Sequence, residues 1–209
     1  MVHNGTVRAG AGQRNPVCFG GRQSVCRRSR RRDDAPAAAD GRLARMESSN
    51  DEQWMRRAME LAQQGETRKG ANPIGCVIVV GGAVVSEACN EVELRHDPTA
   101  HAEMVAIRRA SKHLQSHELR GAVLYTTLQP CGMCTMASIW AKVGRIVFGA
   151  GRDDVHRMYF EDRHLDAMDF IRDAFRNDLV LQGGVLAEEC AGLYVPHWAR
   201  VPRSQRFNV

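Results

Sequence analysis

Two short segments of the chain combine residue types that can bind a metal ion. They are "HAE" at residues 101–103 and "PCGMC" at residues 130–134. Cys131 and Cys134 lie three positions apart, so one helical turn brings both sulfurs to the same side. Two thiolates and one imidazole suit zinc, which binds cysteine and histidine in proteins. We therefore interpret His101, Cys131 and Cys134 as ligands of a zinc ion.

The number of ligands indicates what such a zinc ion does. A structural zinc site normally has four protein ligands, whereas three leave a position open for water. Zinc lowers the pKa of a bound water to about 7, which makes hydroxide available at neutral pH. Glu103, two residues beyond His101, can carry a proton between that water and a leaving group. Ala102 leaves room for a flat substrate, to which its backbone N–H can donate.

Other interpretations of the cysteines remain open at this point. Taken alone, Cys131 and Cys134 are also typical of packing residues, a redox pair or half of a zinc ribbon. A zinc-stabilised binding module without turnover is a further possibility. The chain has seven cysteines, an odd number that fits a reducing compartment better than a disulfide framework. We therefore expect an intracellular, cytoplasmic protein.

Hydrophobic periodicity predicts the elements that position these segments. A capping box at Ser49–Glu52 predicts a helix over 50–65, and Gly81 and Gly82 predict a tight turn between two strands of a hairpin. Strands and helices then alternate, which favours an α/β fold, a three-layer α/β/α sandwich around a mixed sheet of about five strands. The expected strands are 76–80, 83–89, 122–128, 145–150 and 178–181, and the later helices are centred on 100–114, 131–142, 165–175 and 186–194.

Three aromatic residues follow the metal-binding segments. Trp140, on the helix expected over 131–142, is interpreted as a core residue. Tyr159 and Phe160 are interpreted either as packing residues or as aromatic side chains that stack on a bound base.

Charge is unevenly distributed along the chain. Residues 1–45 contain ten arginines and three aspartates, a net +7, whereas the other 164 residues carry 19 basic and 21 acidic side chains, a net −2. We expect residues 1–45 to be a disordered Arg-rich extension and residues 46–209 to form the folded domain. The extension is interpreted as a transit peptide, an RNA-binding arm or translated upstream sequence before a start at Met46. No apolar run approaches the roughly 18 residues of a membrane span, so we expect no membrane partner.

These motifs resemble the cytidine deaminase superfamily, in the branch that includes bacterial guanine deaminases and tRNA adenosine deaminases. The resemblance runs from about Asp51 to Leu193 and includes "NPIGCVIV", "DPTAHAEMVAIRRA", "LYTTLQPCGMC", "RIVFGA" and "LAEECA" in the family's order. It implies a cytidine deaminase-like fold and a homodimer. It also implies zinc on His101, Cys131 and Cys134, with Glu103 as general acid and base.

The resemblance adds a substrate-binding residue and shows two departures. Asn90 matches a family asparagine whose amide contacts the purine ring, where it can both donate and accept hydrogen bonds. Position 129 is Gln, whereas the motif usually has Glu there. The segment 152–175 resembles neither branch, and family members shape their specificity in this region.

The expected reaction is hydrolytic deamination with release of ammonia. The first candidate substrate is guanine, guanosine or a related aminopurine, and the second is the adenosine at the wobble position of a tRNA anticodon. Binding tRNA requires several Lys or Arg contacts to phosphates. The net charge of −2 outside the extension supplies no such excess, which favours the small molecule. Three arginines near the C-terminus keep the tRNA alternative open: Arg200, Arg203 and Arg206.

Overall fold

The computed structural model describes residues 37–67, 72–156, 159, 166–174 and 176–200. The strands are β1 (Gly75–Val80), β2 (Ala83–Cys89), β3 (Ala122–Leu128), β4 (Arg145–Ala150) and β5 (Val180–Gln182). The helices are α1 (Ala37–Glu66), α2 (Val92–Arg95), α3 (Ala102–Leu114), α4 (Gly132–Trp140), α5 (Ala167–Asp173), α6 (Ala187–Gly192) and α7 (Tyr194–Arg200).

The strands form one mixed sheet in the order β2-β1-β3-β4-β5. β1 is antiparallel to both β2 and β3, whereas β4 is parallel to β3 and to β5. β1 and β2 are the predicted hairpin, and both glycines of its turn, Gly81 and Gly82, have the positive φ that such turns require. The predicted mixed α/β sheet is therefore confirmed.

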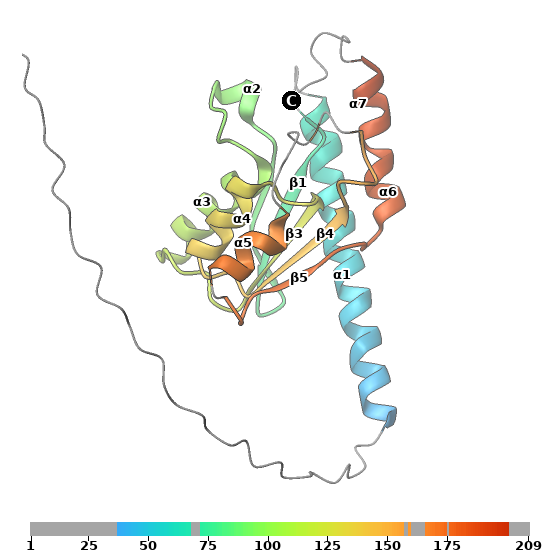
Figure 1. The fold of residues 1–209 in the computed structure, drawn as a ribbon, viewed down its shortest axis with the longest axis vertical. Helices are drawn as coiled ribbons and strands as arrows, with labels where there is room; N and C mark the ends of the chain where they lie inside the picture. The colour runs from blue at the N-terminus through green and yellow to red at the C-terminus, as the bar shows by residue number, and fades with distance from the viewer. Residues whose placement is uncertain (1–36, 68–71, 157–158, 160–165, 175, 201–209) are drawn as a thin grey trace, which may run out of the picture. The chain divides into compact units, whose positions relative to one another are not determined.

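Helices cover both faces of the sheet (Figure 1). α3 packs on β1 and β2, and α4 lies beside α3 and α5 on the same face. α1 packs on β1, β2 and β3 from the opposite face, where α6 contacts β4. The predicted three-layer arrangement is thus observed, with the core formed by apolar side chains on both faces of the central strands.

Neighbouring side chains of β3 point to opposite faces of the sheet, as in any β-strand. Tyr125 points toward α1, where its hydroxyl donates to Asp51 at 2.9 Å. Thr126 is paired in register with Cys76 of β1 and with Phe148 of β4. The strand then ends at Leu128, three residues before Cys131. β3 therefore delivers the second metal-binding segment at its carboxyl end.

The first helix differs from its prediction. α1 begins at Ala37, whereas the capping box predicts a start near residue 50. Ser49 and Glu52 lie inside the helix, so the predicted start is wrong. The residues ahead of them, "AAADGRLARME", are rich in good helix formers, which favours continuation over a cap. The helix includes residues 37–45, for which composition predicts disorder, while residues 1–36 lie outside the described residues.

Trp140 also differs from its prediction as a core residue. It is the last residue of α4 and is 74% exposed. Tyr159, by contrast, is buried against the ring of Tyr194, with centroids 4.8 Å apart, as packing predicts. Phe160, grouped with Tyr159 in the sequence, lies outside the described residues.

Two smaller differences concern short helices. The short helix α2 was not predicted, and the single helix predicted over 186–194 is two helices, α6 and α7. In the part of the chain that the structure describes, every helix is too short or too polar to cross a lipid bilayer.

Candidate metal centre and catalytic site

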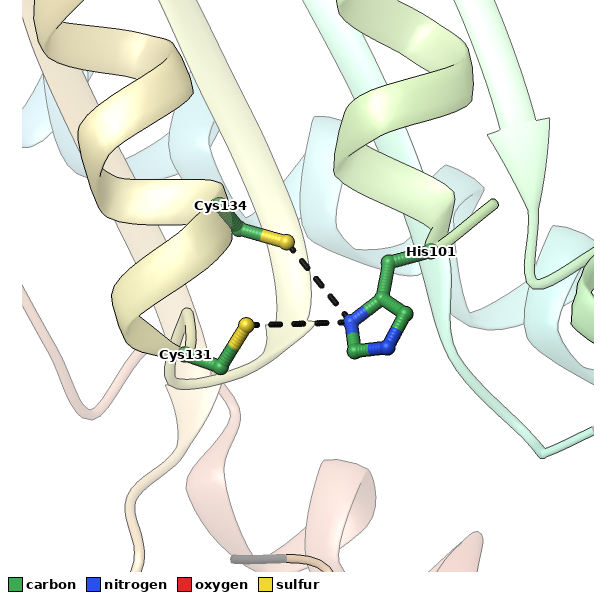
Figure 2. Close-up of side chains that lie close together, drawn as sticks. All are labelled: His101, Cys131 and Cys134. Atoms are coloured by element: carbon green, nitrogen blue, oxygen red, sulfur yellow. Dashed lines mark hydrogen bonds between the residues drawn. The ribbon is translucent and has the colours of Figure 1, made fainter. Parts of the chain in front are cut away.

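The three predicted zinc ligands lie together, at the starts of two helices. His101 is the N-cap residue of α3 and Cys131 is the N-cap residue of α4, with Cys134 in the first turn of α4. Figure 2 shows the imidazole of His101 facing both sulfurs. The distance from His101 Nδ1 to the Sγ atom is 3.8 Å for Cys131 and 3.7 Å for Cys134.

These separations fit one shared zinc ion. Zinc–sulfur and zinc–nitrogen bonds of about 2.3 Å and 2.0 Å at a tetrahedral angle place the two donor atoms about 3.5 Å apart. The ligand atoms of His101, Cys131 and Cys134 all lie within 4.8 Å of one another. Among the described residues, no fourth His, Cys, Asp or Glu joins this group. The donor set therefore fits zinc with three protein ligands, as the sequence predicts.

The two thiols share a hydrogen bond that favours one thiolate. The hydrogen bond from Cys134, together with one from His101, lowers the pKa of the Cys131 thiol to about 4. The same hydrogen bond to Cys131 and burial raise the pKa of Cys134. Thiolate is the form of cysteine that binds a metal. The pair is therefore prepared to give up its first proton when a metal ion binds.

Glu103 lies in the first turn of α3, one residue beyond its first residue. Its side chain is 3% exposed, and burial raises the pKa of its carboxyl group. Within the described part of the chain, its Oε2 atom has no hydrogen-bond partner. Buried polar atoms without partners are rare in folded proteins because they cost free energy. Such an atom beside a metal site is suited to contact a ligand.

Asn90 and Ala102 were predicted to bind the substrate. Asn90 is 2% exposed and follows the end of β2, where its Oδ1 accepts a hydrogen bond from the Val92 N–H at 3.2 Å. Its Nδ2 is buried and has no partner among the described residues, so this donor remains available. Ala102 is fully buried as the first residue of α3. The roles of both residues stay predictions.

Sequence reasoning missed Glu91, which follows Asn90. Its carboxylate is 4% exposed and forms ion pairs with Arg95 and with Arg109 of α3. Its backbone N–H donates to the Ala100 carbonyl at 2.9 Å. Glu91 therefore holds the segment of Asn90 against the start of α3. The spacing of Glu91 and Arg95, four residues apart, was a signal in the sequence, whereas the contact with Arg109 depends on the fold.

Gly132, between the two cysteine ligands, is in close contact with α5. A Cβ atom at this position would lie 2.7 Å from the Cζ atom of Phe170, closer than real side chains approach. A side chain at position 132 would force the Phe170 ring to shift, so glycine lets the ring lie where it does on the start of α4. The sequence did not predict this contact, because residues 132 and 170 meet only through the packing of α5 on α4.

Comparisons with known proteins agree with this geometry. Residues 48–150 match the family model described as the cytidine and deoxycytidylate deaminase zinc-binding region. The match includes both metal-binding segments, together with Asn90 and Glu103.

The relatives that match this chain include enzymes named for two activities. The chain is 36% identical over 154 residues to a tRNA-specific adenosine deaminase of Haemophilus influenzae, covering 71% of this chain and 83% of that protein. It is 40% identical over 113 residues to a guanine deaminase of Bacillus subtilis, covering 54% and 72%. A solved structure from work on A-to-I editing by tRNA deaminases at the wobble position has a TM-score of 0.57 and 30% identity, covering 68% and 98%.

Proposed function

The chain belongs to the cytidine and deoxycytidylate deaminase family of zinc-dependent hydrolases, and on that premise we propose that it deaminates an aminopurine base or nucleoside. The observation that carries this proposal is that two buried polar atoms have no partner among the described residues. They are Glu103 Oε2, two residues after the metal ligand His101, and Asn90 Nδ2, whose neighbour Glu91 is hydrogen-bonded to Ala100. Guanine and guanosine are the first substrates to test.

We assign the metal to His101, Cys131 and Cys134 and the proton transfers to Glu103. When bound, zinc acts as a Lewis acid that makes a water molecule nucleophilic at neutral pH. In the reaction, oxygen from water bonds to the ring carbon that carries the amino group, and the carbon–nitrogen bond then breaks to release ammonia. Glu103 moves one of the water's two protons to the departing nitrogen, and the other stays on the product, on a ring nitrogen or on the new oxygen. Its burial keeps that carboxylate away from bulk water.

Two residues are proposed to orient the ring. The Nδ2 atom of Asn90 is a buried donor without a partner among the described residues, so it can donate to an acceptor on the purine. The backbone N–H of Ala102, at the start of α3, supports the same ring from the other metal-binding segment. Binding a purine would satisfy the Asn90 donor, which favours a ligand that carries a matching acceptor.

The charge of the domain favours a small substrate. Residues 46–209 carry 19 basic and 21 acidic side chains, which gives no excess of cations for phosphates. A second candidate is the adenosine of a tRNA anticodon, favoured by the 36% identity to a tRNA-specific adenosine deaminase over 83% of that relative's length. Charge favours the small substrate, whereas the relatives include both kinds of enzyme, so a direct comparison of the two substrates is the test.

The test is ammonia release from a panel of guanine, guanosine, adenine, cytosine and an anticodon stem-loop, with the zinc-loaded full chain. We expect turnover of guanine or guanosine. Conversion of the stem-loop alone, weakening as salt rises, would replace the first candidate with the second. A protein that binds zinc and releases ammonia from none of them would indicate the non-catalytic binding module.

Three further assignments accompany this proposal. The deaminase domain is proposed to be residues 46–209, supported by the family match that begins at residue 48, with α1 extending ahead of it to Ala37. The protein is proposed to be a cytoplasmic homodimer. Size-exclusion chromatography with light scattering tests the dimer, and a monomer with full activity would contradict it.

A further inference from the structure

Gln129, the residue where the deaminase motif usually has Glu, makes hydrogen bonds in two directions. Its Oε1 accepts from the backbone N–H of Arg152 at 3.2 Å, and its Nε2 donates to Asp166 Oδ2 at 3.3 Å. Its own backbone N–H donates to the Ala150 carbonyl at 2.8 Å. One side chain therefore contacts residues on both sides of the segment that follows β4.

Asp166 connects this side chain to α5. It is the N-cap residue of α5, and its Oδ1 accepts from the Met168 N–H at 2.8 Å. The two oxygens of Asp166 thus have separate partners, one in α5 and one in Gln129. One turn further along α5, Phe170 lies on Gly132, between the two cysteine ligands. α5 is therefore held against the metal-binding segment at two points, residues 129 and 132.

The contact with Asp166 requires the amide that this chain has at position 129. A glutamate at position 129 could still accept from the Arg152 N–H, but it has no proton to donate to Asp166 when ionised. It would instead place a second carboxylate against the first, and like charges at that distance repel. The amide is therefore matched to Asp166, which lies in the region that differs from the family pattern.

We propose that Gln129 is a positioning residue that fixes α5 as a wall of the substrate pocket, through its hydrogen bond to Asp166. This inference rests on the proposed function for its effect on substrate binding. The link between Gln129 and Asp166 can be measured without any substrate.

The experiment compares the wild-type full chain with Gln129→Glu, Asp166→Asn and the double variant. Gln129→Glu should release α5, so amide hydrogen exchange in residues 167–173 should become at least about tenfold faster. KM for the aminopurine should rise about tenfold while kcat changes less than about threefold, since the metal ligands and Glu103 are untouched. Zinc content, measured by elemental analysis, should be unchanged.

The double variant supplies the decisive control. Its new amide at position 166 can still accept from the Met168 N–H and can donate to the new carboxylate at position 129, so both exchange and KM should return toward wild-type values. Gln63→Glu adds the same charge on an exposed position of α1 and should change neither. Wild-type exchange in Gln129→Glu, or no recovery in the double variant, would overturn the proposal. If no substrate is converted, the exchange measurements still decide the Gln129–Asp166 link, while the proposed function fails separately.

Discussion

The buried polar groups on the two sides of β3 differ in how many hydrogen-bond partners they have. On the face toward α1, Asp51 accepts hydrogen bonds from Tyr125 and from both terminal nitrogens of Arg145. On the opposite side of the sheet, Glu103 keeps one side-chain oxygen without a partner among the described residues, and so does Thr126. The first group is saturated with partners, and the second is not.

This contrast separates a face whose buried polar groups support the fold from a face whose buried polar groups could still gain partners. A buried polar atom left without a partner costs roughly 1–3 kcal/mol, so the unpaired groups oppose folding. The saturated group around Asp51 connects α1 to β3 and β4 without that cost. Removing residues from the two faces should therefore have opposite effects on stability and activity.

The largest effect should come from a metal ligand. His101→Ala removes the nitrogen that faces both sulfurs, so we expect loss of zinc and of all measurable deamination. Elemental analysis and ammonia release measure the two effects. Zinc bound at the wild-type ratio in this variant would contradict the assignment of His101.

On the saturated face, Asp51→Ala should act on stability alone. It leaves the buried Tyr125 hydroxyl without its acceptor and the partly exposed Arg145 without its carboxylate, which should cost about 2 kcal/mol. Denaturant unfolding should show this loss while zinc content stays the same. Glu52→Ala, next to it in sequence but in an exposed ion pair, is the matched control, with an expected effect below about 1 kcal/mol. Equal losses in the two variants would remove the distinction between paired and exposed acids.

On the face with unpaired polar groups, Glu103→Gln should lower activity without lowering stability. Turnover should fall about 100-fold or more, as for loss of a general base. Stability should stay the same or rise, because a buried carboxyl group with an unpaired oxygen is replaced by a neutral amide. Kinetics and thermal unfolding of the same zinc-loaded sample measure both. A variant that is clearly destabilised would show that Glu103 is part of the fold's support.

The smallest effect should come from an ion pair at the edge of the sheet, between Arg57 of α1 and Glu87 of β2. The hydrogen bond from Arg57 lowers the pKa of Glu87 below its ordinary value of 4.5. The folded state then binds this proton less readily than the unfolded state, so the contribution of Glu87 is complete above pH 4.5 and is lost as pH falls through the lowered pKa.

Both partners are partly exposed, so the contribution should be about 1 kcal/mol or less. Glu87→Gln should remove this part of the acid dependence, which unfolding curves between pH 3 and 7, taken at roughly unit intervals, would reveal. Parallel curves for the variant and the wild type would show that the pair contributes nothing measurable.

The metal site could be predicted from the sequence because its information is local. His101 and Glu103 lie two residues apart at the start of one helix, and Cys131 and Cys134 share the first turn of another. Each pair is positioned by the helix that follows it, whatever the rest of the fold does. The alternation of strands and helices likewise predicted the sheet and the two layers of helices.

The contacts that could not be predicted join residues far apart in the chain. Tyr125 and Asp51 are 74 positions apart, and Gln129 and Asp166 are 37 apart. Their pairing depends on where α1 and α5 pack, which no local pattern encodes. The start of α1 differs from its prediction for a related reason, since a capping box at Ser49 does not end a helix whose preceding residues also favour helix.

The adjacency of Tyr125 and Thr126 restricts how this strand can change in evolution. Inserting or deleting one residue in β3 would turn every following side chain to the other face of the sheet. Side chains that now pack against α1 would then face α3 and α4. Such a change would exchange the roles of both faces at once, so this strand should vary only by substitution. The two-glycine tip between β1 and β2, whose residues have nothing within 4 Å of an added Cβ, is where length variation should be tolerated.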